Sequence, residues 1–240
     1  MALILPPQWF FASDLIIDFF SFIVLLAFTI ISLSYYKISK NRSFFYLGIS
    51  FLLICLGQFF EIFMNLKIYY DLTNMFHLGN VIIASHVAKP LQIVNYLGGL
   101  FYRLFVLIGF YFLYYASKKE HKIQKFEKSS RWNHLVIVYL LIVLAVLTST
   151  AFQFFAITVA LFSVIIFFNY NRVYRETGSK NSLVLAISFI ILFVSYMVLA
   201  FVTMSPTTYI LANVLQLVAF IMLLYLMICI FYHGRKLKKN

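Results

Sequence analysis

The chain alternates between long apolar stretches and short polar connections. Seven stretches each hold about 20 predominantly apolar residues, the length of helix that crosses the ~30 Å hydrocarbon core of a bilayer. They cover residues 11–35, 44–64, 91–115, 132–147, 152–170, 183–203 and 208–231. This pattern predicts an all-α integral membrane protein in which residues 1–240 form a single domain of seven transmembrane helices. The fourth stretch is short and almost meets the fifth, so a tight turn is predicted within residues 146–155.

The basic residues are concentrated in every second connection. Of the 19 lysines and arginines, 16 follow the first, third, fifth or seventh apolar stretch. They are Lys37, Lys40, Arg42, Lys118, Lys119, Lys122, Lys125, Lys128, Arg131, Arg172, Arg175, Lys180, Arg235, Lys236, Lys238 and Lys239. Because cytoplasmic connections carry an excess of Lys and Arg, this asymmetry predicts an external N-terminus and a cytoplasmic C-terminus. Such a chain is expected in the plasma (cytoplasmic) membrane as a multi-pass protein.

Composition agrees with the membrane prediction and explains the net charge. The chain is 64% hydrophobic and carries a formal net charge of +12, whereas soluble domains are only about 45–50% apolar. In a soluble chain this charge would suggest nucleic acid as a partner. Here the cations flank the apolar stretches, so anionic lipids of the cytoplasmic face are the expected partners and no nucleic acid is expected.

Two connections resemble each other. The run "YYKISKNRSFFYLGISF" at 35–51 and the run "VYRETGSKNSLVLAISF" at 173–189 can be aligned without a gap. Tyr36 then matches Tyr174, and the Ile-Ser-Phe run at 49–51 matches that at 187–189. This match predicts a 3+1+3 parallel repeat, with repeats at 11–115 and 152–231 and the 132–147 helix as a linker. The alternative is that two cytoplasmic connections converged independently, since both need basic residues and interfacial tyrosines.

The predicted layout is similar to that of the microbial rhodopsins and of small sugar transporters built on parallel repeats. Rhodopsins need a lysine in the seventh helix to bind retinal, and residues 208–232 contain none. The sugar transporters carry a Pro-Gln pair in each repeat. Here Leu91 separates Pro90 from Gln92, and Pro206 precedes a threonine. No retinal or other cofactor is therefore expected.

The run "YYKISKNRSFFYLGISFLLICLG" at 35–57, with its echo at 174–195, resembles uncharacterised seven-helix membrane proteins of archaea and the seven-helix sensor modules of histidine kinases. This resemblance implies a receptor or sensor with an output domain after the seventh helix. Only "HGRKLKKN" follows Tyr232. The expected signal therefore passes through a separate partner protein or through helix motion alone.

Four ionisable residues fall within the apolar stretches: Asp14, Asp18, Glu61 and Arg103. Such residues cost about 2.5–3.5 kcal/mol each at mid-helix and normally face the interior of a bundle. Asp14 follows Ser13 at the start of a helix, where it is expected to act as a cap. The other three are accompanied by amides at helical spacing.

These residues predict an outward-facing polar pocket that binds a ligand. Its expected lining is Asp18, Gln58, Glu61, Asn95, Arg103, Asn213 and Gln216. In the alternative interpretation, Arg103 pairs with Glu61 or Asp18 and the amides only tie helices together.

Catalytic and metal-binding motifs are missing, so no enzyme is expected. None of the five histidines forms the i, i+3 or i, i+4 pair of a helical metal site. Asp71, His77 and His86 share a connection at 65–90, which leaves a loose metal site or a plain loop with a short helix as alternatives. Cys55 and Cys229 are expected to be buried thiols, because structural disulfides belong to oxidising compartments.

Three functions fit these predictions. A receptor or sensor agrees with an outer polar pocket above an apolar inner half. An accessory subunit of a larger membrane complex agrees with the lack of catalytic motifs. A small-solute transporter agrees with the parallel repeat but needs a polar path to the cytoplasm. The first is preferred.

Overall fold

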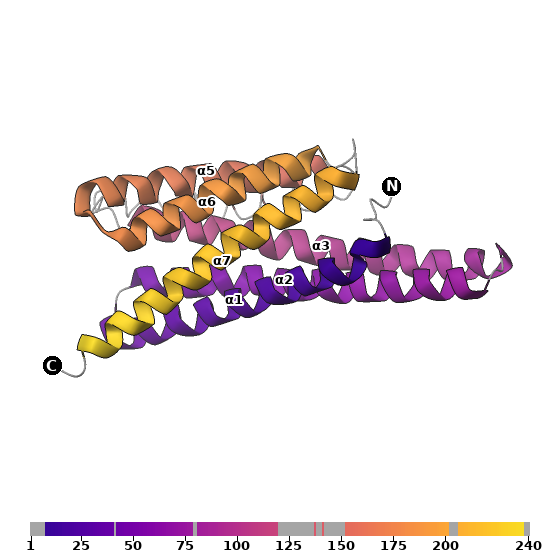
Figure 1. The fold of residues 1–240 in the computed structure, drawn as a ribbon, viewed down its shortest axis with the longest axis horizontal. Coiled ribbons are helices and arrows are strands. Elements are labelled where there is room, and N and C mark those ends of the chain that lie inside the picture. Colours follow the sequence, from indigo (N-terminus) through magenta and orange to yellow (C-terminus); the bar gives the residue numbers. More distant parts are fainter. Residues whose placement is uncertain are drawn as a thin grey trace.

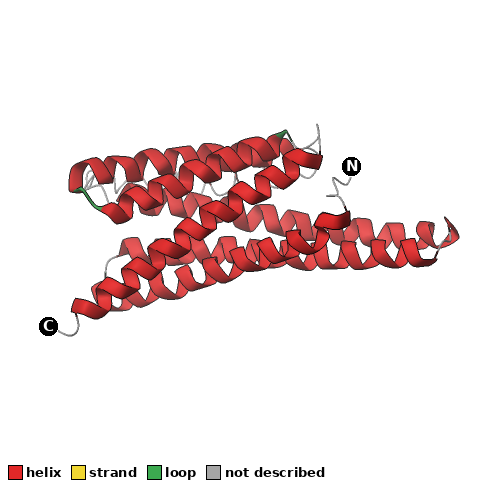
Figure 2. Ribbon diagram, in the orientation of Figure 1, coloured by secondary structure: helices red, strands yellow, loops and turns green. Residues whose placement is uncertain are grey.

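The structure is a computed structural model, and it describes residues 8–40, 42–78, 81–119, 137, 141, 152–201 and 206–237. All regular elements in these ranges are helical (Figures 1 and 2). A short 3-10 turn, η1 (Gln8–Phe10), precedes α1. The helices are α1 (Phe11–Ser39), α2 (Arg42–Leu78), α3 (Val81–Lys119), α5 (Phe152–Thr177), α6 (Lys180–Ala200) and α7 (Pro206–Leu237). All six are long and apolar enough to cross a membrane.

The helices are apolar on both their inner and outer faces. On α1, Val24, Leu25 and Phe28 are buried in the core, while Ile16 and Phe19 are exposed on the other side. Exposed apolar residues are costly in water but not in lipid, and a helix that is hydrophobic all round is typical of a membrane span. The six helices therefore indicate a multi-pass membrane protein.

The six helices form two groups of three. In the first triplet, α2 packs against both α1 and α3; in the second triplet, α6 packs against both α5 and α7. The triplets meet where α3 contacts α5 and where α7 crosses α1 (Figure 1). The core extends through both triplets and includes Leu141, one of two described residues in the region predicted as the fourth helix. The rest of that helix lies outside the described residues.

The turns after α1 and α5 have the same backbone geometry. Lys40 has φ of 54° and Gly178 has φ of 65°, the left-handed conformation that often ends a helix. The Lys40 amide donates to the Tyr36 carbonyl at 2.9 Å, and the Gly178 amide donates to the Tyr174 carbonyl at 2.8 Å. The two turns thus end their helices in the same way, although only one of them uses glycine.

Close helix packing in the first triplet depends on glycine. A Cβ atom at Gly109 would lie 2.5 Å from Ile54 Cγ1 and 3.0 Å from the Ser50 carbonyl oxygen. A Cβ atom at Gly57 would meet Val106 Cγ2 at 2.8 Å. Small residues let helix backbones approach closely, as membrane helices commonly do. Hence α2 and α3 pack together with glycine on both sides of the contact.

The largest departure from the predicted helices is between α2 and α3. The sequence predicts a helix ending at residue 64 and another starting at 91, with a long connection between. Instead α2 continues to Leu78 and α3 begins at Val81, so helix occupies most of the predicted connection at 65–90, while the stretches apolar enough to span a membrane end at Lys67 and begin again at Tyr96. The two helices project as a hairpin beyond the rest of the bundle (Figure 1). The side chains of Asp71, His77 and His86 lie outside the described residues.

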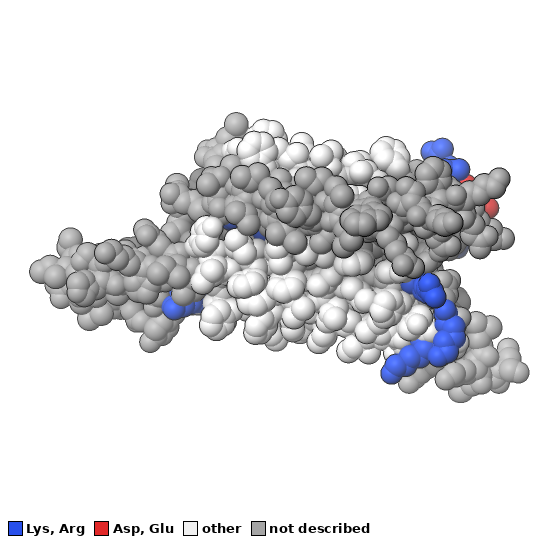
Figure 3. Space-filling model, turned by 180° about the vertical axis from the view of Figure 1, so that it is seen from behind, with Lys and Arg blue, Asp and Glu red and all other residues white. Residues whose placement is uncertain are grey.

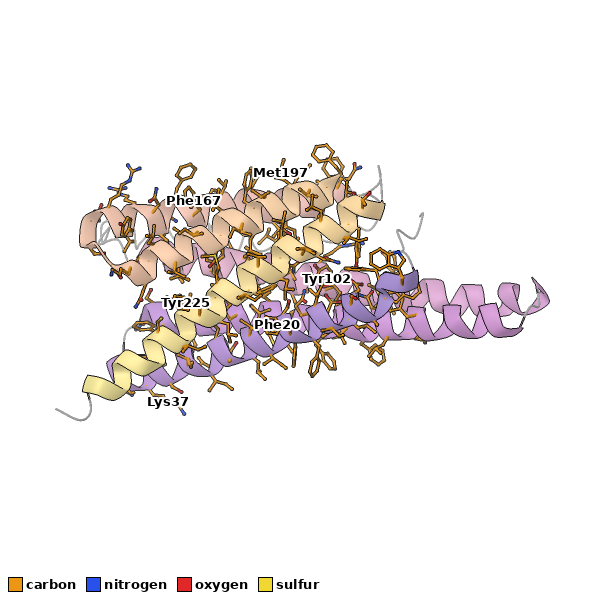
Figure 4. The ribbon with its side chains drawn as sticks, in the orientation of Figure 1. Phe20, Lys37, Tyr102, Phe167, Met197 and Tyr225 are labelled. Atoms are coloured by element: carbon orange, nitrogen blue, oxygen red, sulfur yellow. The ribbon has the colours of Figure 1, made fainter. Side chains whose placement is uncertain are left out.

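One end of the bundle is basic. Lys37 lies in the last turn of α1 and Arg175 in the last turn of α5, and Lys40, Arg42 and Lys180 border the following turns. Figure 3 shows blue side chains at this end of the molecule, and Figure 4 labels Lys37 there. We call it the basic end. The N-terminal end of α1 lies at the opposite end.

Candidate functional site

A buried carboxylate joins three helices at the end opposite the basic end. Asp14 is 0% exposed. Its Oδ2 accepts a hydrogen bond from the Tyr69 hydroxyl of α2 at 2.5 Å. From α7, the Tyr209 hydroxyl donates at 2.9 and 3.0 Å, and Asn213 Nδ2 donates to Oδ1 at 2.7 Å. Burial, followed by the adjacent Asp14 charge, raises the pKa of the Tyr69 hydroxyl well above its usual range, so this hydroxyl stays a donor.

Two further acidic residues lie deeper in the same region. Asp18 Oδ2 accepts a hydrogen bond from Asn65 Nδ2 at 3.1 Å. Glu61 Oε2 accepts one from Gln58 Nε2 at 2.8 Å, one turn away on α2. A neutral amide therefore satisfies each of these carboxylates in part. Burying a charge is costly unless it is hydrogen-bonded, and these bonds lower that cost.

Tyrosines carry the network from the first triplet to the second. The Glu61 carboxylate is also hydrogen-bonded by Tyr102 of α3. Tyr102 is in turn hydrogen-bonded to Tyr196 of α6. Figure 4 labels Tyr102, which lies in the interior of the bundle. We refer to Asp14, Asp18, Gln58, Glu61, Asn65, Tyr69, Tyr102, Tyr196, Tyr209 and Asn213 as the polar network.

Arg103 lies beside this network without an acidic partner from it. Its side chain is 9% exposed, yet its Nε has no hydrogen-bond partner. Among the described residues the ion pair is Arg172–Glu176 on the surface, and Arg103 forms none with Asp18 or Glu61. The guanidinium carbon instead lies 5.7 Å from the centroid of the Phe152 ring, a cation–π arrangement.

The Arg103 side chain lies beside Gly99, one turn earlier on α3. A Cβ atom at Gly99 would lie 3.7 Å from Arg103 Nη2. The guanidinium therefore folds back along its own helix. In this conformation it is close enough to interact electrostatically with Glu61 but does not contact it as an ion pair. A buried cation with an unused donor results.

A cavity lies between the triplets next to the network. It has a volume of about 10 Å³. Its lining consists of Leu25, Phe51, Ile54, Gln58, Phe110, Leu113, Phe189, Leu192, Tyr196, Gln216, Phe220 and Leu223. Gln58, Tyr196 and Gln216 are its polar residues, and the remaining walls are apolar. Gln58 is 1% exposed, and its Oε1 has no hydrogen-bond partner.

The predicted pocket residues occupy related but different positions. Asp18, Gln58, Glu61 and Asn213 belong to the polar network, Arg103 borders it, and Gln216 lines the cavity. The side chain of Asn95 lies outside the described side chains. The alternative interpretation paired Arg103 with Glu61 or Asp18, and no such ion pair is found in the described part of the structure.

The prediction that Asp14 is a helix cap is wrong. Phe10 occupies the N-cap position and makes no side-chain capping bond. Asp14 is instead the most highly connected member of the network. Asn65, Tyr69 and Tyr102 were not predicted either. Helical spacing places Gln58, Glu61 and Asn65 on one face of α2, and that signal could have identified Asn65.

Metal binding finds no support in the described residues. No group of three His, Cys, Asp or Glu side chains among them is arranged to hold a metal ion. Cys55 is a free, buried thiol, as predicted, and its Sγ contacts the Phe22 carbonyl oxygen at 3.7 Å. Cys229 is a thiol that is only partly buried.

Comparison of the chain with protein-family models, with curated proteins and with solved structures found no match.

Proposed function

We propose that this chain is a non-enzymatic, receptor-like or sensor-like membrane protein that binds a small polar ligand beside Arg103. The observation that carries the proposal is a buried guanidinium that pairs with neither Asp18 nor Glu61 and whose Nε lacks a partner. Native proteins rarely leave a buried donor unused, and an absent ligand is one explanation of such a group. A ligand with an acceptor group, such as a carboxylate, hydroxyl or carbonyl, would satisfy it.

The proposed topology places the ligand site in the outer half of the membrane. The chain has seven transmembrane helices in this proposal, with the N-terminus outside and the basic end at the cytoplasm of a plasma membrane. Each cation near an anionic membrane surface contributes about 1 kcal/mol of attraction. The basic end supports this orientation, since it holds Lys37, Arg42, Arg175 and Lys180.

The proposal includes the 3+1+3 parallel repeat. Exchange of the two triplets would convert the α1–α7 contact into the α5–α3 contact, and both contacts exist. The two left-handed turns also correspond, because the gap-free alignment that places Tyr36 on Tyr174 places Lys40 on Gly178. Independent convergence of two cytoplasmic connections explains similar turns, but it does not explain matched contacts elsewhere in the bundle.

The apolar inner half supports a receptor over a transporter. From the direction of the helices, Phe51, Leu113, Phe189 and Leu223 form the wall of the cavity that faces the basic end. A transporter would need polar groups continuing past this wall. In the receptor proposal, a bound ligand alters the packing of the triplets, and the spacing of the helix ends carries the signal to a partner protein.

A small-solute transporter is the second candidate, and a specific observation favours it. The cavity lies between the two triplets, and transporters with repeats place their substrate at the interface of the repeats. This function predicts accumulation of solute by proteoliposomes. The receptor proposal predicts binding without accumulation.

Native mass spectrometry of protein gently extracted from its own membranes tests the proposal. We expect a small-molecule adduct on the unmodified protein that is lost in Arg103→Leu. The matched control is Arg172→Leu, which removes the same charge from an exposed position and should keep the adduct. An adduct that survives in folded Arg103→Leu would contradict the proposal. A stoichiometric protein partner without any adduct would instead favour an accessory subunit.

A further inference from the structure

The cavity between the triplets has the dimensions and the polarity of a water site. Its volume of about 10 Å³ matches the room that one water molecule needs. Apolar cavities of this kind stay empty, but here Gln58, Tyr196 and Gln216 bring polar atoms from three helices. A buried water typically makes about three hydrogen bonds to groups that would otherwise be unsatisfied.

Gln58 brings an unsatisfied acceptor to this cavity. Its Nε2 donates to Glu61, which fixes the orientation of the amide and leaves Oε1 without a partner. A buried acceptor without a hydrogen bond costs about 1–3 kcal/mol. Flipping the amide would not help, since the carbonyl oxygen would then face the Glu61 carboxylate. The cavity is thus the remaining source of a donor.

Tyr196 brings a donor to the cavity. In the Tyr102–Tyr196 bond the Tyr102 hydroxyl donates and the Tyr196 oxygen accepts. The single hydroxyl proton of Tyr196 can therefore be donated to an acceptor in the cavity.

We infer that this cavity binds one water molecule that joins the first triplet to the second. The water donates a proton to Gln58 Oε1, and the Tyr196 hydroxyl donates to the water oxygen. The Gln216 amide, on α7, can also donate to the water oxygen. A chain of hydrogen bonds then runs from Tyr102 through Tyr196, the water and Gln58 to Glu61. This inference does not depend on the proposed function.

The proposed water lies between matching residues of the two triplets. The gap-free alignment of the two connections pairs the cavity-lining residues of α2 with those of α6. A second gap-free alignment pairs the cavity-lining residues of α3 with those of α7. The matched pairs are Phe51 with Phe189, Ile54 with Leu192, Gln58 with Tyr196, Phe110 with Phe220 and Leu113 with Leu223. We call residues matched in either alignment equivalent. The water therefore lies between equivalent parts of the two triplets, where relative motion of the triplets would make or break its bonds.

Hydroxyl-radical labelling read by mass spectrometry tests this inference on the full chain in lipid nanodiscs. Radicals formed from a bound internal water label adjacent side chains even when bulk solvent cannot reach them. Tyr170 is the matched control, because it and Tyr196 are both 3% exposed and only Tyr196 lines the cavity. We expect Tyr196 to be oxidised at least about threefold faster than Tyr170 if a buried water is present. Equal rates would overturn the inference.

Two variants sharpen the test. Gln216→Leu and Gln58→Leu each replace a polar side chain of the cavity wall by an apolar one. The cavity should then no longer bind water, and the oxidation rate of Tyr196 should fall to that of Tyr170. The Tyr170 rate itself should not change, which verifies that the bundle is intact. If Tyr196 stays strongly labelled in both variants, the radicals come from elsewhere and the inference fails. The comparison within the unmodified protein remains decisive if a variant does not fold.

Discussion

The two triplets share a layout but differ in charge. Four charged residues in the interior of the first triplet match neutral residues of the second. Asp14 is matched with Phe152, Asp18 with Ala156, Glu61 with Leu199 and Arg103 with Asn213. The second triplet packs its three helices with these neutral residues, and both Ala156 and Leu199 are buried there. The second triplet therefore packs without charged residues at these positions.

The hydrogen-bond partners of the buried acidic residues separate their roles. Asp14 accepts hydrogen bonds from α2 and α7, so it holds the bundle together. Asp18 and Glu61 accept bonds mainly from residues near them in the network, and Arg103 lacks an acidic partner there. Buried charges that a fold does not require are typical of binding and transport sites in membrane proteins. The proposed site therefore draws its charged residues from the first triplet and neutral partners from the second.

The largest effect is expected from breaking the Asp14 connection. Asp14→Leu removes the acceptor of hydrogen bonds from Tyr69, Tyr209 and Asn213, of which Tyr69 and Asn213 are buried and Tyr209 is partly buried. Each unsatisfied group costs about 1–3 kcal/mol, so the free energy of unfolding should fall by about 3 kcal/mol or more. Unfolding by SDS in mixed micelles measures this change. Glu176→Ala, at an exposed site, is the control and should change stability by less than about 1 kcal/mol. A similarly small change for Asp14→Leu would show that the triplets do not depend on this contact.

A smaller effect is expected where the first triplet packs more closely than the second. Gly109 is equivalent to Ala219, so α7 carries a Cβ where α3 has none. Gly109→Ala would force its Cβ against Ile54 and the Ser50 carbonyl, at an expected cost of about 1–3 kcal/mol. Gly98→Ala is the matched control, because its Cβ would lie at an ordinary 3.5 Å from Met64. The same SDS titration should therefore separate the two variants, and equal stabilities would mean that α2 and α3 are not in close contact at Gly109.

The smallest effects are expected at the two left-handed turns, where residues can be exchanged. Lys40→Gly removes the side chain that is unfavourable in a left-handed conformation, so the free energy of unfolding should rise by up to about 1 kcal/mol. Gly178→Lys makes the opposite change and should lower stability by about the same amount. Opposite signs in the melting temperatures would confirm that the turns are equivalent. Effects of the same sign would indicate that the turns differ.

Much of the bundle could be predicted from hydropathy, since six of the predicted helices overlap α1, α2, α3, α5, α6 and α7. The extension of α2 and α3 could not, because a helix that leaves the lipid no longer needs an apolar sequence. Pro90 lies inside α3, although proline usually occurs in the first turn of a helix.

The candidate site was predictable only in part. Burial of Asp18, Glu61 and Arg103 follows from the cost of charge in lipid. The role of Asp14 depends on partners 55, 195 and 199 residues away, so no local pattern reveals it. The free Oε1 of Gln58 likewise results from how the triplets pack, because its orientation is fixed by Glu61 and its surroundings come from α6 and α7.

The most direct test of the central claim installs the neutral residues of the second triplet in the first. The variant combines Asp18→Ala, Glu61→Leu and Arg103→Asn, and the measurement is its midpoint of thermal unfolding. Replacing buried charges by neutral residues is often neutral or stabilising, by about 1–4 kcal/mol. We therefore predict a midpoint equal to or above that of the unmodified protein, which would mean that these charges serve binding rather than folding. A midpoint lowered as far as that of Asp14→Leu would show that the charges hold the bundle together, and would contradict the proposed site.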